Sequence, residues 1–170
     1  MEKLEQFIGS YKDFPKKGII FRDTLEILKE PVVFNELIKN MSTAEFFNSA
    51  EAILCIDARG FIFGSAISLL TSKPLVVARK PGKLPGELVT KSYKLEYGKN
   101  VLSIQKKSVE KFESFVIVDD LLATGGTANC VYEMLKNFGK RVTGLSVVVE
   151  LKKLKGRSKI PISINSQIVY

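Results

Sequence analysis

Short apolar runs alternate with helical segments from residue 52 onwards, and this alternation restricts the fold more than any other feature of the chain. The apolar runs are AILCI, PLVVAR, FVIV and GLSVVV, and helical periodicity falls at about residues 61–70 and 127–138. Strands that alternate with helices are typical of parallel sheets, because each connecting helix covers a face of the sheet. We therefore expect an α/β fold, with a mostly parallel twisted sheet flanked by helices.

A single domain accounts for the whole chain. Its 170 residues suit one compact core, and no linker, repeat or low-complexity tract divides it. Residues 2–11 carry apolar side chains at helical spacing and predict a short amphipathic helix, followed by a loop around Pro15 and Gly18. Pro31, a residue favoured at the first helical position, predicts a second helix that ends near Ser42. The positions predicted to be buried in that helix are Phe34, Leu37, Ile38 and Met41.

The segment KPGKLPGELVTKSYKLEYGK, residues 80–99, shows no strong periodicity in its first half. A stretch of this length without regular structure inside a compact domain is usually functional or mobile. Its second half alternates in YKLEYG, so part of the segment is also compatible with a hairpin arm.

The chain contains no histidine, which excludes several classes of enzyme. Ser/His/Asp catalysis, His-ligated zinc sites and the H-x-E deaminase site all require that residue. Any general acid or base must therefore be another residue type. Cys55 and Cys130 lie far apart in apolar segments and form no C-x-x-C pattern, so we expect two buried thiols in a reducing compartment.

Charge and hydropathy limit the partners. The formal net charge of +8 suits either nucleic acid or a small polyanionic substrate, and composition does not separate the two. No apolar run approaches the ~20 residues that a membrane helix needs, and the N-terminus lacks the apolar core of a signal peptide. We expect a soluble, cytoplasmic protein that contacts no membrane.

The stretch VIVDDLLATGGT, residues 116–127, carries the strongest functional signal. Asp119 and Asp120 follow a run of apolar residues, and neighbouring carboxylates at the end of a buried strand repel each other and lose solvation. A basic residue or a divalent cation nearby would relieve this repulsion, and both carboxylates can accept hydrogen bonds from ribose hydroxyls. The pair therefore predicts a site that holds a ribose.

The loop that follows the two carboxylates predicts a phosphate site. Gly125 and Gly126 allow several backbone N–H groups to point into one concavity at the start of a helix, and Thr124 and Thr127 add hydroxyl donors. A loop of this kind at the carboxyl end of a strand lies where open α/β sheets bind ligands. A plain strand–turn–helix that uses Thr-Gly-Gly only as a cap is the structural alternative for the loop considered alone.

The pattern of VIVDDLLATGGT matches neither of the two common nucleotide-binding motifs, because G-x-x-x-x-G-K-[ST] and G-x-G-x-x-G are both missing. It instead resembles the phosphoribosyl pyrophosphate motif of the type I phosphoribosyltransferases, and its similarity to the adenine phosphoribosyltransferases among them is close. Other blocks resemble that family in the same order: DFPKKGIIFRD, DARGFIFG, RKPGKLPG, SYKLEYG and VVELKKLKGR. RKPGKLPG together with LEYG separates this family from its hypoxanthine, orotate and uracil relatives.

The resemblance implies a reaction and a set of residues for it. The reaction is transfer of a 5-phosphoribosyl group from phosphoribosyl pyrophosphate to adenine, which gives AMP and pyrophosphate in purine salvage. The residues implied for phosphoribosyl pyrophosphate are Arg59, Arg79, Lys80, Lys83, Asp119, Asp120, Ala123, Thr124, Gly125, Gly126 and Thr127. Those implied for adenine are Ile20, Phe21, Arg22 and Leu151, and those implied for catalysis are Glu96, Tyr97 and Arg59.

The resemblance also implies an architecture around the site. Residues 1–30 would form a hood over the base, and residues 80–97 a flexible catalytic loop. The pyrophosphate site would be completed partly by the neighbouring subunit, which implies a homodimer. Mg²⁺ is expected as the cofactor and would be held mainly by substrate oxygens and water, with no dedicated protein ligands.

Several alternatives remain open from the residues alone. Ile20 and Phe21 lie in an apolar run that is typical of core, Arg59 can be an ordinary surface arginine, and Glu96 an exposed strand residue. Guanine, hypoxanthine or xanthine can replace adenine, because the main-chain groups that select the base cannot be identified in a sequence. A regulator that binds nucleic acid through its basic run, residues 152–159, is the alternative from another class, although we expect no nucleic-acid partner.

Overall fold

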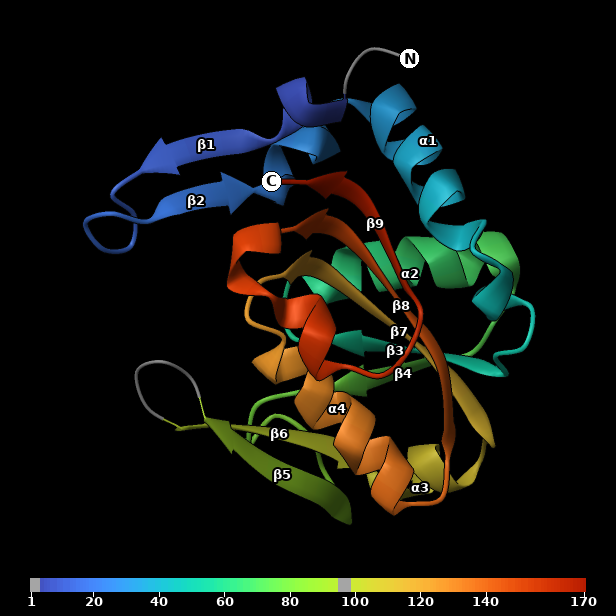
Figure 1. Cartoon of the computed structure of the whole chain (residues 1–170). Helices are drawn as coiled ribbons and strands as arrows, with labels where there is room; N and C mark the ends of the chain where they lie inside the picture. The colour runs from blue at the N-terminus through green and yellow to red at the C-terminus, as the bar shows by residue number, and fades with distance from the viewer. Residues whose placement is uncertain (1–3, 95–98) are drawn as a thin grey trace.

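A parallel sheet forms the centre of the molecule. The computed structural model describes residues 4–94 and 99–170. Its main sheet has five strands in the order β4-β3-β7-β8-β9, and every neighbouring pair in it is parallel, as the alternation of strands and helices predicts (Figure 1). The bounds of these strands are β3 Ala52–Ile56, β4 Leu75–Ala78, β7 Ser114–Leu122, β8 Arg141–Glu150 and β9 Ile164–Val169.

Helices cover both faces of this sheet. α1 (Pro31–Ser42) and α2 (Gly60–Thr71) pack on one face, and α4 (Gly126–Asn137) lies on the other, close to the short α3 (Lys106–Glu110) (Figure 1). Successive strand residues point to opposite faces, so Val116 packs with the α1–α2 layer and Ile117 with the α4 layer. Burial on both faces explains why these strands are continuously apolar in sequence.

The predicted helix at Pro31 is confirmed, and its residues Leu37, Ile38 and Met41 are buried, while Phe34 is only partly buried. The predicted helix over residues 2–11 is wrong. Leu4–Phe7 forms one 3₁₀ turn, η1, after which β1 (Gly9–Lys12) pairs antiparallel with β2 (Ile20–Asp23). Gly9 and Ser10 are weak helix formers, and a nearby strand offers their backbone groups partners that a short helix lacks.

The hairpin alternative for the segment around residue 90 is correct. β5 (Leu88–Lys94) and β6 (Lys99–Gln105) form an antiparallel arm that packs on α4. The described residues also include the 3₁₀ helices η2 Thr24–Lys29, η3 Glu45–Phe47, η4 Lys152–Leu154 and η5 Gly156–Lys159. The flexibility predicted for residues 80–97 stays a prediction.

The two cysteines are buried free thiols, as the sequence predicts. Burial raises the pKa of Cys55 to about 12 and that of Cys130 to about 11, so both thiols are protonated at neutral pH. Among the described residues, no helix combines the length and the apolar character that a membrane span requires.

Candidate functional site

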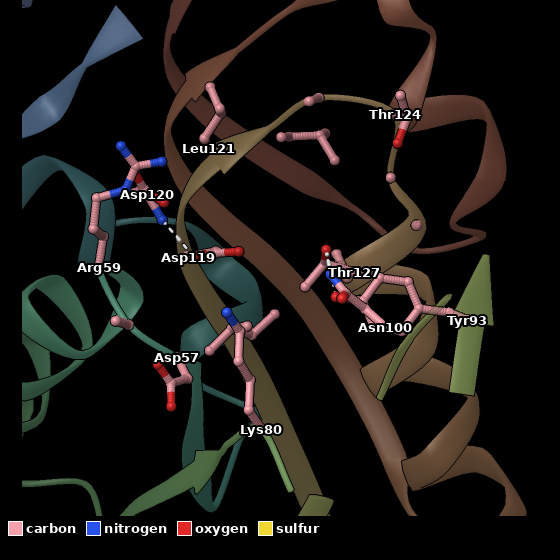
Figure 2. A pocket seen from close by; sticks show the side chains of 17 residues that line it. Asp57, Arg59, Lys80, Tyr93, Asn100, Asp119, Asp120, Leu121, Thr124 and Thr127 are labelled. Atoms are coloured by element: carbon pink, nitrogen blue, oxygen red, sulfur yellow. Dashed lines mark hydrogen bonds and ion pairs between the residues drawn. The ribbon is translucent and has the colours of Figure 1, made fainter. Parts of the chain in front are cut away.

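A pocket of about 430 Å³ opens where the central parallel strands end. β3 leads into one wall, β7 and the start of α4 form the floor and the opposite wall, and the β5–β6 arm borders it (Figure 2). The polar and charged residues that line it are Asp57, Arg59, Lys80, Tyr93, Asn100, Asp119, Asp120, Thr124 and Thr127. The carboxyl ends of parallel strands are the usual place for a ligand in such a fold. The DARGF block and the stretch VIVDDLLATGGT meet here.

The loop between β7 and α4 has the geometry that phosphate binding requires. Gly125 has φ +78° and is the N-cap of α4, so the chain reverses there into a conformation that favours glycine. Glycine has no side chain to cap the helix, so the first N–H groups of α4 have no intrahelical or side-chain acceptor. This first turn lines the pocket together with Thr124 and Thr127. A helix N-terminus with such donors attracts an anion.

Asp119 and Asp120 occupy different environments although they are adjacent. Asp120 is 4% exposed, and its Oδ2 lies 2.9 Å from Arg59 Nε and accepts a hydrogen bond from Thr24 Oγ1 at 3.0 Å. The Asp119 carboxylate is more accessible and points into the pocket, where the Asp120 N–H donates to its Oδ1 at 2.9 Å (Figure 2). Asp119 is therefore the carboxylate better placed for direct contact with a ligand.

Burial shifts both carboxyl groups towards the neutral form. Burial, and next the charge of Asp120, raise the pKa of Asp119 well above its ordinary value. Burial also raises the pKa of Asp120, although the Arg59 guanidinium and the Thr24 hydroxyl act in the opposite direction. The site thus holds two carboxylates at a free-energy cost that a polar or cationic ligand would reduce.

The structure separates the basic residues predicted for the anion. Lys80 lines the pocket, whereas Arg79 Nε pairs with Asp57 Oδ2 at 3.0 Å and its guanidinium lies over the ring of Phe61. Lys83 does not line the pocket. Arg59 lines it, but its guanidinium is directed towards Asp120, so it is not the freely solvated arginine that the sequence left open.

A second, more apolar cavity of about 660 Å³ lies under the β1–β2 hairpin. Arg59 lines both cavities, so the two adjoin each other. Phe21 faces this second cavity, with the Phe14 ring edge-on at 5.1 Å and the Arg59 guanidinium 5.2 Å from its centroid. An aromatic face in an apolar cavity beside a polar one suits a flat ring joined to a sugar.

The other residues predicted to bind a base surround the same hairpin. Ile20 is 49% exposed, so it is not the core residue that its apolar run suggests. Arg22 lies 3.6 Å from the ring centroid of Tyr170 and donates to the Ser10 hydroxyl. Leu151 is partly buried against the α1–α2 core. Neither Arg22 nor Leu151 lines the two cavities, so their roles stay predictions.

Sequence reasoning missed three polar residues of the first pocket. Tyr93 and Asn100 are cross-strand partners in the arm, and Thr127 Oγ1 donates to Tyr93 Oη at 3.2 Å. Asp57, in the DARGF block, directly follows the last residue of β3 and faces the pocket (Figure 2). The alternation in the arm indicated a hairpin, but not which of its faces meets α4. The predicted catalytic residues Glu96 and Tyr97 lie outside the described residues.

The oxygen-rich lining fits a hard cation that is held mostly by its substrate. Within the described part of the chain, no three Asp, Glu, Cys or His side chains lie close enough together to hold a metal by themselves. The Asp57 and Asp119 carboxylates open into the pocket, where they can contact a cation or its water shell. Mg²⁺ prefers such oxygen ligands and retains several waters.

Comparisons with known proteins agree with this geometry. A family model described as phosphoribosyl transferase domain matches residues 24–167. An adenine phosphoribosyltransferase of Prochlorococcus marinus (strain MIT 9211) is 63% identical over 167 residues, which are 98% of this chain and 97% of the relative. The solved adenine phosphoribosyltransferase of Thermoanaerobacter pseudethanolicus has a TM-score of 0.90 at 37% identity, with 99% of each chain covered.

A third relative was solved with ligands bound. The adenine phosphoribosyltransferase of Saccharomyces cerevisiae, complexed with D-2,5-dideoxy-2,5-imino-altritol 1,6-bisphosphate and adenine, has a TM-score of 0.89 at 33% identity. The match covers 98% of this chain and 97% of that one. Its ligands are a purine base and a bisphosphate.

Proposed function

Because the chain belongs to the phosphoribosyltransferase family, we propose that it transfers a 5-phosphoribosyl group from phosphoribosyl pyrophosphate to adenine, in purine salvage. The products are AMP and pyrophosphate. The observation that carries this proposal is the pair of adjoining cavities, one lined by the phosphate loop and two carboxylates and the other by Phe21. The high identity to adenine phosphoribosyltransferases supports adenine as the base.

Different residues of the first pocket bind the phosphate and the ribose of the sugar phosphate. The N–H groups and hydroxyls of residues 123–127 bind the 5′-phosphate, and Asp119 accepts from the ribose hydroxyls. Asp120 holds Arg59 in place and contributes negative charge beneath the ribose. Displacement at the anomeric carbon develops positive charge on the sugar, and carboxylates beside the sugar stabilise that charge.

The leaving pyrophosphate needs cations. Lys80 already lines the pocket, and Arg59 lines it as well, with its guanidinium paired to Asp120. Bound Mg²⁺ would neutralise charge on the pyrophosphate oxygens, with the Asp57 and Asp119 carboxylates available to its water shell. Arg79 assists indirectly, since its pairing with Asp57 keeps that carboxylate at the pocket wall.

Adenine would bind against Phe21 in the second cavity. Ile20, Arg22 and Leu151 do not line that cavity, so their contacts with the base stay predictions from the family resemblance. The hairpin of residues 9–23 would then act as the hood. Glu96 is the proposed acid or base that moves a proton at a ring nitrogen of the purine, with Tyr97 beside it in the catalytic loop. With no histidine in the chain, a carboxyl group is the suitable acid/base candidate.

A homodimer in the cytoplasm completes the proposal. α2 is apolar around its circumference, and Leu69 and Leu70 are 86% and 47% exposed on it, as expected for a helix that a second subunit covers. Lys83 does not line the pocket of its own subunit, which agrees with a role in the site of its neighbour. The two protonated thiols agree with a reducing compartment.

Pyrophosphate release by the purified protein tests the proposal directly. The protein would be incubated with Mg²⁺ and phosphoribosyl pyrophosphate, together with adenine, guanine, hypoxanthine, xanthine or orotate. Release with adenine alone is the expected result. Release with another base would overturn the assignment of the base but keep the phosphate and ribose sites. No release with any base, by a protein that still binds phosphoribosyl pyrophosphate, would favour a nucleic-acid-binding regulator instead.

A further inference from the structure

The backbone at Gly156 presses directly against the loop proposed for the 5′-phosphate. A Cβ atom built at Gly156 would lie 2.3 Å from the Ala123 carbonyl oxygen and 2.8 Å from the Gly125 nitrogen. A Cβ built at Gly125 would lie 2.6 Å from the Gly156 carbonyl oxygen. The opposing atoms are backbone atoms, which cannot rotate away as the end of a long side chain can. Each of the two segments therefore limits where the other can lie.

Several hydrogen bonds hold the side chain of Arg157, the residue after Gly156. Arg157 Nε donates to Glu150 Oε1 at 3.0 Å, and Arg157 Nη2 donates to the other carboxylate oxygen. Arg157 Nη1 donates to the Ile164 carbonyl oxygen at 3.0 Å. The Ser166 hydroxyl accepts from Nη2 and donates to Glu150 Oε2 at 2.6 Å. Arg157 is thus held on both β8 and β9.

Glu150 in turn lies at the base of the phosphate loop. It pairs in register with Leu122, the residue immediately before Ala123, and the Leu151 N–H donates to the Leu122 carbonyl oxygen at 2.9 Å. Its side chain is only 7% exposed. The hydrogen bond from Arg157, followed by the one from Ser166, lowers the pKa of Glu150, although burial opposes this shift. A charged carboxylate at this depth requires its arginine partner.

We propose that Glu150 and Arg157 are positioning residues for phosphate binding. They hold Gly156 against the backbone of residues 123–125, as a clamp, and so orient the N–H groups of this loop. Neither side chain lines the pocket, so both act through Gly156. The inference rests on the proposed function, since it requires that this loop bind the 5′-phosphate. Hydrogen bonds to an anion weaken steeply when their donors are misdirected, so a small shift of the loop has a large effect.

The experiment isolates the contribution of the phosphate to binding. The dissociation constants of AMP and adenosine would be measured by calorimetry for each variant. The dissociation constant of adenosine divided by that of AMP reports what the 5′-phosphate adds to binding. Gly156→Ala adds a methyl group where only backbone lies, and we expect it to lower that ratio about tenfold or more while the adenosine value changes little. A general loss of structure would weaken both ligands together and leave the ratio unchanged.

A double variant tests the clamp itself. Glu150→Gln with Arg157→Gln removes both charges at once, so that the Glu150 carboxylate is not left buried without its partner. We expect the adenosine-to-AMP ratio of dissociation constants to fall as in Gly156→Ala, with the far-ultraviolet circular dichroism of the wild type retained.

Gly144→Ala is the matched control. A Cβ at Gly144 would lie 2.4 Å from the ring of Phe46, so this substitution also crowds β8, but away from the pocket. It should lower the melting temperature and leave the ratio at the wild-type value.

The outcomes separate this inference from the function on which it rests. A wild-type ratio in both Gly156→Ala and the double variant would overturn the clamp and leave the proposed function standing. A fall of equal size in Gly144→Ala would overturn the clamp as well, because the effect would then follow any damage to the sheet. If the wild-type protein binds AMP no more tightly than adenosine, the phosphate site itself is wrong, and the inference fails with it.

Discussion

Asp119 and Asp120 are neighbours in the chain but serve the site in different ways. Asp120 is almost fully buried and accepts from Arg59 and Thr24, whereas Asp119 points into the pocket. Strand alternation sends successive side chains in opposite directions, so one carboxylate faces the hood and the other the ligand. The same two-residue motif therefore supplies a structural contact and a ligand contact.

Asp120→Asn should weaken the use of phosphoribosyl pyrophosphate far more than the binding of adenine. The amide can still accept from Thr24, but it no longer neutralises Arg59, so we expect kcat/KM for phosphoribosyl pyrophosphate to fall about 10- to 100-fold. Steady-state kinetics and calorimetry with adenine measure the two effects. Glu113→Gln makes the same chemical change on an exposed ion pair and should have no effect. Unchanged kinetics in Asp120→Asn would remove the role proposed for the Asp120 charge beneath the ribose.

Asp119→Asn should make the folded protein more stable near neutral pH. A carboxyl group whose pKa is higher when folded binds more protons in the folded state, so stability falls as pH rises from near 3.8 through the raised value. Asparagine does not titrate, so the variant should have the larger free energy of unfolding at about pH 7, with a gain that shrinks towards pH 3.8.

Urea denaturation of wild type and Asp119→Asn across this pH range gives the comparison. If the variant is less stable than the wild type at neutral pH, burial does not raise the pKa of Asp119 as described. The expected gain in stability would be accompanied by a loss of activity, because the Asp119 carboxylate is proposed to bind the ribose.

At the level of elements, one hydrogen bond joins the N-terminal hairpin region to the central sheet. Thr24 is fully buried at the start of η2, directly after β2, and donates to Asp120 on β7. Arg59, at the N-cap of α2, meets the same carboxylate oxygen and also lies over Phe21. The hairpin, β7 and α2 therefore meet at Asp120, between the two cavities.

Thr24→Val should loosen this junction. The substitution keeps the shape of the side chain but removes the donor, which leaves a buried carboxylate with one fewer partner and lowers the free energy of unfolding by about 1–3 kcal/mol. It should also raise the pKa of Asp120 further, because the Thr24 hydrogen bond lowers it. Thr71→Val, which removes only a local bond to the Ile67 carbonyl oxygen at the end of α2, is the control. Equal losses in urea denaturation would argue against a special role for Thr24.

At the level of the whole molecule, the apolar face of α2 predicts how two copies associate. Leu69→Glu places a charge at the most exposed large apolar residue of that helix and should convert the dimer to a monomer in analytical ultracentrifugation. Val32→Glu changes an equally apolar residue that is 74% exposed on α1 and should leave the dimer intact. A dimer in both variants would place the interface elsewhere, and a monomeric wild type would overturn the homodimer.

Much of the architecture could be predicted because local patterns encode it. The four apolar runs became β3, β4, β7 and β8, and the helices after Arg59 and Gly125 begin within a residue of where periodicity places them. β9 was not predicted, since Ile168 is its one buried residue and its sequence lacks a clear apolar pattern. The helix predicted over residues 2–11 was wrong for the opposite reason: a clear helical pattern is present, but β1 pairs with β2 instead.

The strands, the glycine-rich loop after β7 and the acidic pair could be predicted from the sequence, since each depends on residues a few positions apart. Packing between distant segments brings Lys80 to the pocket while Arg79 pairs with Asp57, and lets Asp120 join the hairpin region to the sheet. It alone placed Gly156 against Gly125. These are contacts between distant segments, and their distances follow from how the strands and helices pack, which no local pattern of side chains encodes.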